Sequence, residues 1–237
     1  MCFYDKIIVG RIDIMGKCDF LKSSIIAHRG IYNNITIFEN TMESIMYAVK
    51  NNLIVEIDVR LTSDNELIVF HDDDAGRLIK LKDDINTLTY EELEYLSPYH
   101  IPTLKEVLVN INSKVPIIIE VKEDNKIIRN KLIEVLKNYK GNFAIQSFIY
   151  DAVKFYKKKK YIVGLLVGKT KNRTLLKEEI NVDFLNIKYD TIDRVEANKL
   201  KEKYFIIGYT INKREDVDTY IKVFNNLIID NIEEVFG

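Results

Sequence analysis

The chain has 237 residues, of which 47% are hydrophobic and 30% are charged, and its formal net charge is −1. This balance indicates a globular protein with a large core and excludes the basic surface that nucleic-acid binding requires. No apolar run approaches the ~18 residues of a membrane span, and charged residues interrupt the amino-terminal segment too often for a signal peptide. We therefore expect a cytoplasmic protein whose partner is a small molecule, with no nucleic-acid partner and no membrane span; a homo-oligomer is left open.

The first clear strand begins near residue 24, so residues 1–23 are expected to be an amino-terminal extension and 24–237 a single domain. Cys2 and Cys18 lack the spacing of a metal site, and we expect no role for them. Four apolar residues of the extension could form an added strand or a hairpin that plugs a barrel: Ile7, Val9, Ile12 and Ile14.

Short β-branched runs alternate along the chain with amphipathic segments, a pattern typical of βα units around a parallel sheet. Nine runs predict strands, over residues 25–28, 53–59, 67–71, 117–122, 143–147, 161–167, 184–188, 204–210 and 227–230. Thr103 and Glu106 form a capping box that starts one helix. Further helices are predicted over residues 41–50, 90–96, 125–140, 150–160, 191–201 and 214–224.

The run 67–71 follows 53–59 too closely to be its parallel neighbour, because a parallel crossover needs roughly a dozen residues. It must return as an antiparallel hairpin. A turn at Asp64 and Asn65 would bring His71 opposite Asp58, within a residue or two. Eight parallel strands remain, so we predict an α/β fold: a single-domain (β/α)₈ TIM barrel with a β-hairpin after strand 2 and a short insertion before strand 3.

Carboxylates occupy the inward face of two predicted strands. Side chains alternate along a strand, so an outward apolar face in 53–59 turns Glu56 and Asp58 towards the barrel axis. The same alternation in 117–122 turns Glu120 and Lys122 inward. An isolated pair of this kind is more often a solvated edge, but its recurrence on a second strand favours a site. Buried carboxylates repel one another unless a cation joins them. Hard oxygen ligands suit Mg²⁺ or Ca²⁺, so one divalent cation is predicted.

Two of the three histidines, His28 and His71, end apolar strands. A single histidine at a strand end is usually structural, but two beside carboxylates could flank a substrate as general acid and general base. His100 lies in a predicted loop, and we interpret it as structural.

These residues belong to an ordered set of motifs. The motifs are His28-Arg29-Gly30, Glu39-Asn40-Thr41, Glu56-Ile57-Asp58-Val59, His71-Asp72, Ile101-Pro102-Thr103-Leu104 and Glu120-Val121-Lys122. Together they resemble the glycerophosphodiester phosphodiesterase family in order and spacing. Beyond residue 122 the resemblance is thinner and rests on Gln146-Ser147-Phe148, Tyr209-Thr210-Ile211-Asn212 and Leu227-Ile228-Ile229-Asp230.

The resemblance implies metal-dependent hydrolysis of a glycerophosphodiester to sn-glycerol 3-phosphate and an alcohol. It implies the following roles: His28 and His71 as acid and base; Glu56, Asp58 and Glu120 as metal ligands; Arg29, Lys122 and Asn40 as phosphate-binding residues; Phe148 and Tyr209 as pocket residues. Glu39 borders the site, either as a further metal ligand or as a neighbour of the ligands.

Three alternatives are left open. One is a lyase-type phospholipase of the same superfamily, which would release a cyclic phosphate. Another is a non-catalytic barrel that binds phosphodiesters. The third is that Lys157 to Lys160 form a membrane or nucleic-acid patch, although this run also suits the end of a helix. The sequence does not assign the acid and base between the two histidines, nor the nucleophile, which is water or a substrate hydroxyl.

Overall fold

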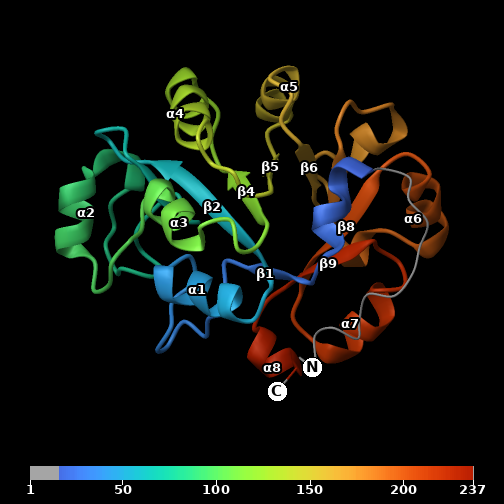
Figure 1. Ribbon diagram of the computed structural model, residues 1–237, viewed down its shortest axis with the longest axis horizontal. Helices are drawn as coiled ribbons and strands as arrows, with labels where there is room; N and C mark the ends of the chain where they lie inside the picture. Colours follow the sequence, from blue (N-terminus) through green and yellow to red (C-terminus); the bar gives the residue numbers. More distant parts are fainter. Residues whose placement is uncertain (1–15, 237) are drawn as a thin grey trace.

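A closed barrel of parallel strands forms the centre of the molecule (Figure 1). The computed structural model describes residues 16–236. Its strands are β1 (Ile26–His28), β2 (Ile54–Leu61), β3 (Leu67–Val69), β4 (Ile117–Val121), β5 (Phe143–Ser147), β6 (Val163–Val167), β7 (Phe184–Lys188), β8 (Phe205–Ile211) and β9 (Asn226–Ile229). Every strand except β3 pairs in parallel with its neighbours, and β1 pairs with both β2 and β9, which closes the barrel. The predicted fold is confirmed.

Helices surround the barrel, as the ribbon shows (Figure 1). They are α1 (Met42–Lys50), α2 (Tyr90–Leu96), α3 (Leu104–Ile111), α4 (Lys126–Leu136), α5 (Tyr150–Lys158), α6 (Arg194–Lys201), α7 (Arg214–Tyr220) and α8 (Ile232–Phe236). Local capping sets several starts: Thr41 caps α1, and Thr103 begins α3 with the predicted capping box. Between residues 16 and 236, none of the helices has the length and hydrophobicity of a membrane span.

Some helix boundaries differ from those predicted. Helix α4 ends at Leu136 rather than near residue 140, because the chain must turn to enter β5 at Phe143. Helix α6 begins at Arg194 rather than at Thr191, because the Asp193 carboxylate accepts a hydrogen bond from Glu196 N and caps the helix there. Helix α5 ends at Lys158, so the lysine run 157–160 lies at a helix end, as predicted.

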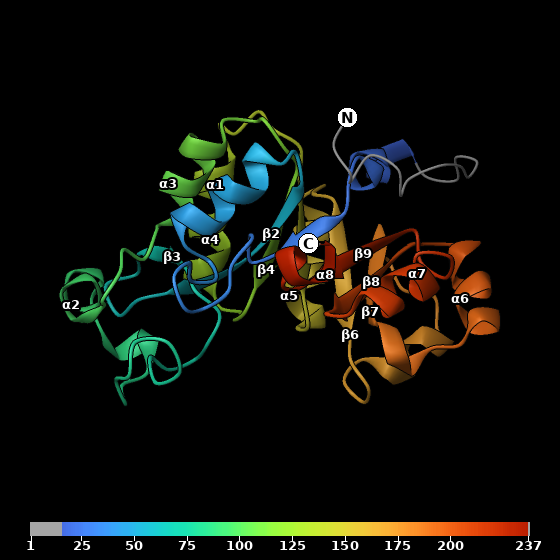
Figure 2. The ribbon, with the colours of Figure 1, turned by 90° about the horizontal axis from the view of Figure 1, so that it is seen from below.

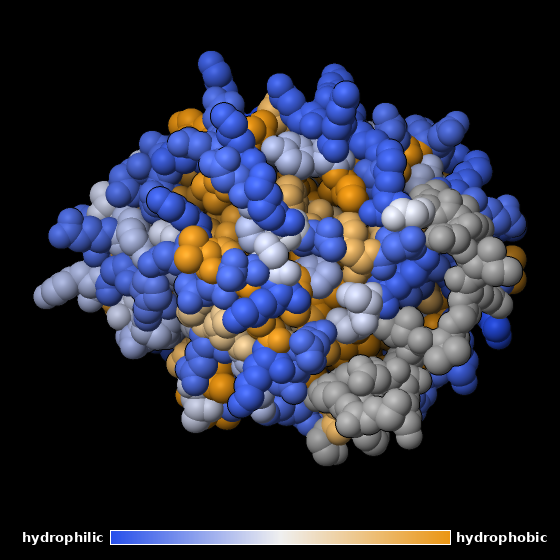
Figure 3. All heavy atoms as spheres, viewed as in Figure 1, coloured by the Kyte–Doolittle hydropathy of each residue, from blue (hydrophilic) through white to orange (hydrophobic). Residues whose placement is uncertain are grey.

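The core has an outer and an inner part. Outward-facing residues such as Val55, Ile57 and Ile119 pack under the helices, while inward-facing ones such as Ile54 and Ile118 pack inside the barrel. This arrangement matches the predicted alternation on β2 and β4. Charged side chains cover much of the molecule, and the face in Figure 3 is mostly hydrophilic with apolar residues between.

The segment β3 pairs antiparallel with β2, as the short connection required. Phe70 N donates to Asp58 O, so His71 lies one residue beyond the position opposite Asp58, within the predicted margin. An insertion with its own small apolar cluster, including Phe70, Ile85 and Leu93, follows β3. It contains α2 and projects from one side of the barrel (Figure 2).

A 3₁₀ helix, η2 (Gly16–Lys22), closes one end of the barrel. Cys18 and Leu21 are fully buried in the inner cluster, and Asn226 Nδ2 donates to Leu21 O. These residues belong to the segment predicted as an extension, yet they are part of the barrel's core. Ile7, Val9, Ile12 and Ile14, for which an added strand or a hairpin was considered, lie outside the described residues.

Candidate active site

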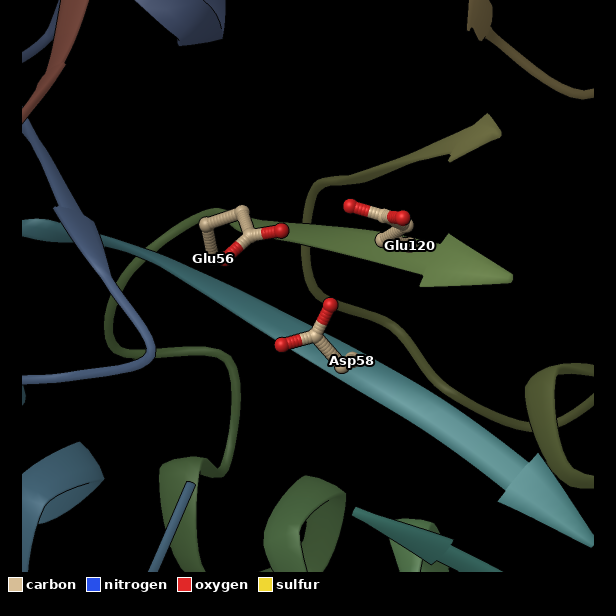
Figure 4. Close-up of side chains that lie close together, drawn as sticks. All are labelled: Glu56, Asp58 and Glu120. Carbon is tan, nitrogen blue, oxygen red and sulfur yellow. The ribbon is translucent and has the colours of Figure 1, made fainter. Parts of the chain in front are cut away.

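Three carboxylates meet inside the barrel, on adjacent strands. Glu56 and Asp58 extend from β2 and Glu120 from β4, with Asp58 directly opposite Glu120 in the strand register. One oxygen from each lies within 4.8 Å of the others, and the three residues are 1%, 0% and 7% exposed. Figure 4 shows the three side chains together. The structure thus brings together the three residues expected to hold a cation.

Burial and mutual repulsion make it unfavourable for all three carboxylates of this cluster to be ionised at once. Burial, and then the charge of Asp58, raise the pKa of Glu56 to about 8. Burial by itself would raise the pKa of Asp58, but the positive charges of Lys122 and Arg29 hold that pKa well below the usual range. Among the described residues, Glu56 Oε2 accepts no hydrogen bond. Buried oxygens of this kind are suitable ligands for a hard divalent cation, so the donor set fits Mg²⁺ or Ca²⁺.

Both predicted histidines reach the pocket beside this cluster. His28 ends β1, and its Nε2 lies 4.0 Å from Glu56 Oε2. Its Nδ1 lies 2.6 Å from Asp230 Oδ1, while His71 Nδ1 lies 2.6 Å from Asp72 Oδ1. A carboxylate at Nδ1 holds the proton there in the neutral ring, which leaves Nε2 for proton transfer.

The two histidines differ in pKa. Burial alone would lower the pKa of His28, but the hydrogen bond and charge of Asp230 raise it above the ordinary value. The pKa of His71 is lowered, mainly by burial. Sequence reasoning missed Asp230 as a partner of His28, although the aspartate stands at the carboxyl end of the last strand, which lies beside β1. Tyr32 was also missed, and its hydroxyl donates to Asp230 Oδ1.

Cationic side chains surround the carboxylates. Lys122 Nζ lies 2.7 Å from Glu120 Oε1 and 3.3 Å from Asp58 Oδ1. Arg29 Nε lies 3.1 Å from Asp58 Oδ2. Arg29 and Lys122 both line the pocket.

Asn40 and Glu39 lie beside the site rather than in the lining of the pocket. Asn40 Nδ2 donates to Asp58 Oδ2, and Asn40 Oδ1 accepts from Asp58 N. Glu39 accepts hydrogen bonds from Arg29, Arg77 and Asn34. Although burial opposes it, these donors lower the pKa of Glu39 to about 2. Its carboxylate is therefore surrounded by donors and lies outside the cluster of three.

Arg77, from the insertion, is a site residue that sequence reasoning missed. Its guanidinium donates to both oxygens of Glu39 and to both oxygens of Asp72. It therefore links the insertion to the partner of His71. Arg77 lies only five residues after Asp72, but its other partner, Glu39, is 38 residues away, and no spacing in the sequence indicates that contact.

The pocket has a volume of about 130 Å³. Its lining includes the expected Phe148 and Tyr209, whose ring centroids lie 6.1 Å apart, and four residues not predicted to line it: Gln146, Leu166, Thr210 and Ile228. His100 lies away from it and pairs with Glu94 and Glu106, which agrees with a structural role.

Comparisons with known proteins agree with this geometry. The model of the glycerophosphoryl diester phosphodiesterase family matches residues 28–233. A glycerophosphodiester phosphodiesterase of Caldanaerobacter subterraneus is 26% identical, over 92% of this chain and 98% of the relative. The crystal structure of a glycerophosphodiester phosphodiesterase from Thermotoga maritima matches with a TM-score of 0.76 and 28% identity, covering 89% of this chain and 96% of that one. A phosphodiesterase of Oleispira antarctica, solved with the product sn-glycerol-3-phosphate, shares the fold, with a TM-score of 0.71, 22% identity and coverage of 87% and 92%.

Proposed function

The chain belongs to the glycerophosphoryl diester phosphodiesterase family, and we propose that it hydrolyses a glycerophosphodiester to sn-glycerol 3-phosphate and an alcohol, using one divalent cation and two histidines. The observation that carries the proposal is the cluster of Glu56, Asp58 and Glu120, two of whose members, Glu56 and Glu120, line one pocket with His28 and His71. The product bound to the Oleispira antarctica phosphodiesterase is consistent with this substrate class.

A phosphodiester resists hydrolysis because its anionic oxygens repel nucleophiles and its leaving group is a poor alkoxide. Glu56, Asp58 and Glu120 would hold Mg²⁺ or Ca²⁺, which when bound neutralises charge on the phosphate oxygens. Arg29 and Lys122 line the same pocket and donate hydrogen bonds to non-bridging oxygens. Phe148 and Tyr209 supply an apolar wall for the glycerol or alcohol portion.

The two histidines transfer the protons. One removes the proton of the nucleophile through Nε2, and the other protonates the departing alcohol. Asp230 and Asp72 hold the two rings from their Nδ1 sides and stabilise each ring when it becomes charged. The nucleophile is water, or a substrate hydroxyl that first forms a cyclic phosphate.

A panel of glycerophosphodiesters, assayed for released glycerol phosphate with and without a chelator, tests the proposal. We expect release that the chelator abolishes and that added Mg²⁺ or Ca²⁺ restores. Phosphorus NMR of the products separates the lyase alternative, because a lyase accumulates a cyclic phosphate. If the chelator does not change the release of glycerol phosphate, the reaction does not depend on a metal. If no diester releases glycerol phosphate, the barrel is a protein that binds phosphodiesters without cleaving them.

A further inference from the structure

Two buried amides extend the carboxylate cluster across the inside of the barrel. Gln146 on β5 and Asn186 on β7 are 1% and 0% exposed. Gln146 Nε2 donates to Glu56 Oε1 over 3.0 Å, and Asn186 Nδ2 donates to Gln146 Oε1 over 2.8 Å. Buried amides destabilise a fold unless they are hydrogen-bonded, so two on this inner surface require a reason.

When Glu56 is ionised, as a carboxylate that binds a metal must be, the chain of hydrogen bonds has only one self-consistent direction. An ionised Glu56 can only accept hydrogen bonds, so Gln146 must turn its NH₂ group towards the carboxylate. The carbonyl oxygen of Gln146 then faces Asn186, which must donate in turn. The orientation of both amides therefore follows from the carboxylate at the end of the chain, and Asn186 in turn fixes the orientation of Gln146.

The strand register brings these side chains together. Gln146 is paired with Glu120 on one side and with Gly164 on the other. Strand β6 lies between β5 and β7, so Gln146 and Asn186 meet only across the barrel interior. Below them, the Phe184 ring fills the space that a side chain at Gly164 would need, and a Cβ there would lie 2.1 Å from Phe184 Cε2. The amides thus lie between a closed apolar floor and the pocket.

We propose that Gln146 and Asn186 are positioning residues that orient Glu56 for the divalent cation. Gln146 holds Oε1, while Oε2, which accepts no hydrogen bond from the described residues, is left to bind the ion. A neutral amide orients the carboxylate without neutralising it, whereas a lysine or arginine at this position would compete with the metal. The inference rests on the metal site of the proposed function.

The test is a double-mutant cycle on metal affinity, which needs no turnover. The metal-stripped full chain and its variants Asn186→Leu, Gln146→Leu and the double variant are titrated with Ca²⁺ and with Mg²⁺ by calorimetry. Loss of a hydrogen bond to a metal ligand weakens binding by about 10- to 100-fold, and we expect this of Gln146→Leu. We expect it of Asn186→Leu as well, because Gln146 then loses the partner that orients it towards Glu56. The double variant should bind no more weakly than Gln146→Leu, because Asn186 acts through Gln146.

Asn226→Leu is the matched control. Asn226 is also a buried asparagine on a barrel strand, but it donates to Leu21 O and Ser24 O at the end that η2 closes. This variant should lose thermal stability yet bind the cation as the unmodified chain does. Circular dichroism confirms the fold of each variant, and Asn186→Ala replaces Asn186→Leu if the larger side chain prevents folding.

The outcomes separate the two proposals. If the unmodified chain binds neither ion, the metal site itself fails, and this inference fails with it. If the unmodified chain binds but Asn186→Leu binds equally well, the inference alone is overturned. Losses that add in the double variant would likewise overturn it, because Asn186 would then act by a route that does not pass through Gln146.

Discussion

At the scale of single residues, the two histidines come from different segments and reach one pocket. If they exchange the protons of the reaction, His28→Ala and His71→Ala should each lower kcat by at least about 100-fold, the size of effect typical of general acid–base catalysis. Neither side chain belongs to the carboxylate cluster. Calorimetry should therefore show retained metal binding, and circular dichroism a retained fold. Near-normal turnover in either variant would remove that histidine from the mechanism.

The pair formed by His28 and Asp230 makes a prediction about pH. Burial lowers the pKa of His28, and Asp230 more than offsets this, so the pKa lies above its ordinary value of 6.5. In Asp230→Asn the burial effect remains without the opposing charge. The pKa of His28 should therefore fall, and the stability that this pair adds at low pH should be lost.

NMR titration of the metal-free chain measures this directly, because the sequence contains only three histidines. His71 is an internal control whose titration should not move, since its Nδ1 pairs with Asp72 and not with Asp230. An unchanged pKa of His28 would show that Asp230 does not set its protonation.

At the scale of elements, the insertion after β3 contributes Arg77 to the site. The planar guanidinium binds Glu39 and Asp72 at once, a geometry that a lysine ammonium cannot reproduce. We expect Arg77→Lys to lower kcat by about 10- to 100-fold, because Asp72 no longer holds the His71 ring in place. Arg173→Lys is the control, since Arg173 pairs with Glu196 and lies outside the pocket lining. Equal kcat in the two variants would contradict a positioning role for Arg77.

The 3₁₀ helix η2, which closes one end of the barrel, leads to a prediction about stability. Leu21 is 0% exposed within the inner cluster. Leu21→Ala should therefore lower the free energy of unfolding by about 2–5 kcal/mol, the usual range for a buried leucine. Leu96→Ala makes the same chemical change at a residue that is 42% exposed, and it should cost much less. Chemical denaturation measures both. Comparable losses would mean that η2 contributes little to the core.

At the scale of the whole molecule, a contact could be predicted from the sequence only where its two residues lie close together along the chain. Alternation along one strand placed Glu56 and Asp58 inward, and the short hairpin placed His71, because these relations are local. Asp230 is 202 residues from His28, and the two meet only because the barrel closes between β9 and β1. Arg77 reaches Glu39 from an insertion whose path no periodicity describes. Contacts of this kind require the closed fold.

The buried carboxylates also affect the stability of the folded chain as a whole. Burial and Asp58 raise the pKa of Glu56 from 4.5 to about 8. A raised pKa in the folded state means that the stability associated with this group is complete below 4.5 and is lost as the pH rises through about 8. Without metal, the folded chain should therefore become less stable over this range, because the unfolded chain releases the proton of Glu56 from about pH 4.5, whereas burial and Asp58 keep it on the folded chain until about pH 8.

Glu56→Gln removes this charge with little change in shape. In chelator, the variant should have a higher Tm than the unmodified chain at pH 9, and the difference should shrink towards pH 5, where Glu56 is largely protonated. With Ca²⁺ or Mg²⁺ the order should reverse, because a bound ion stabilises only the chain that keeps all three ligands. Glu134→Gln, at an exposed position of α4, should change Tm in neither condition. A Glu56→Gln variant less stable than the unmodified chain without metal would contradict this, because the expected gain comes from removing a charge that burial and Asp58 both disfavour.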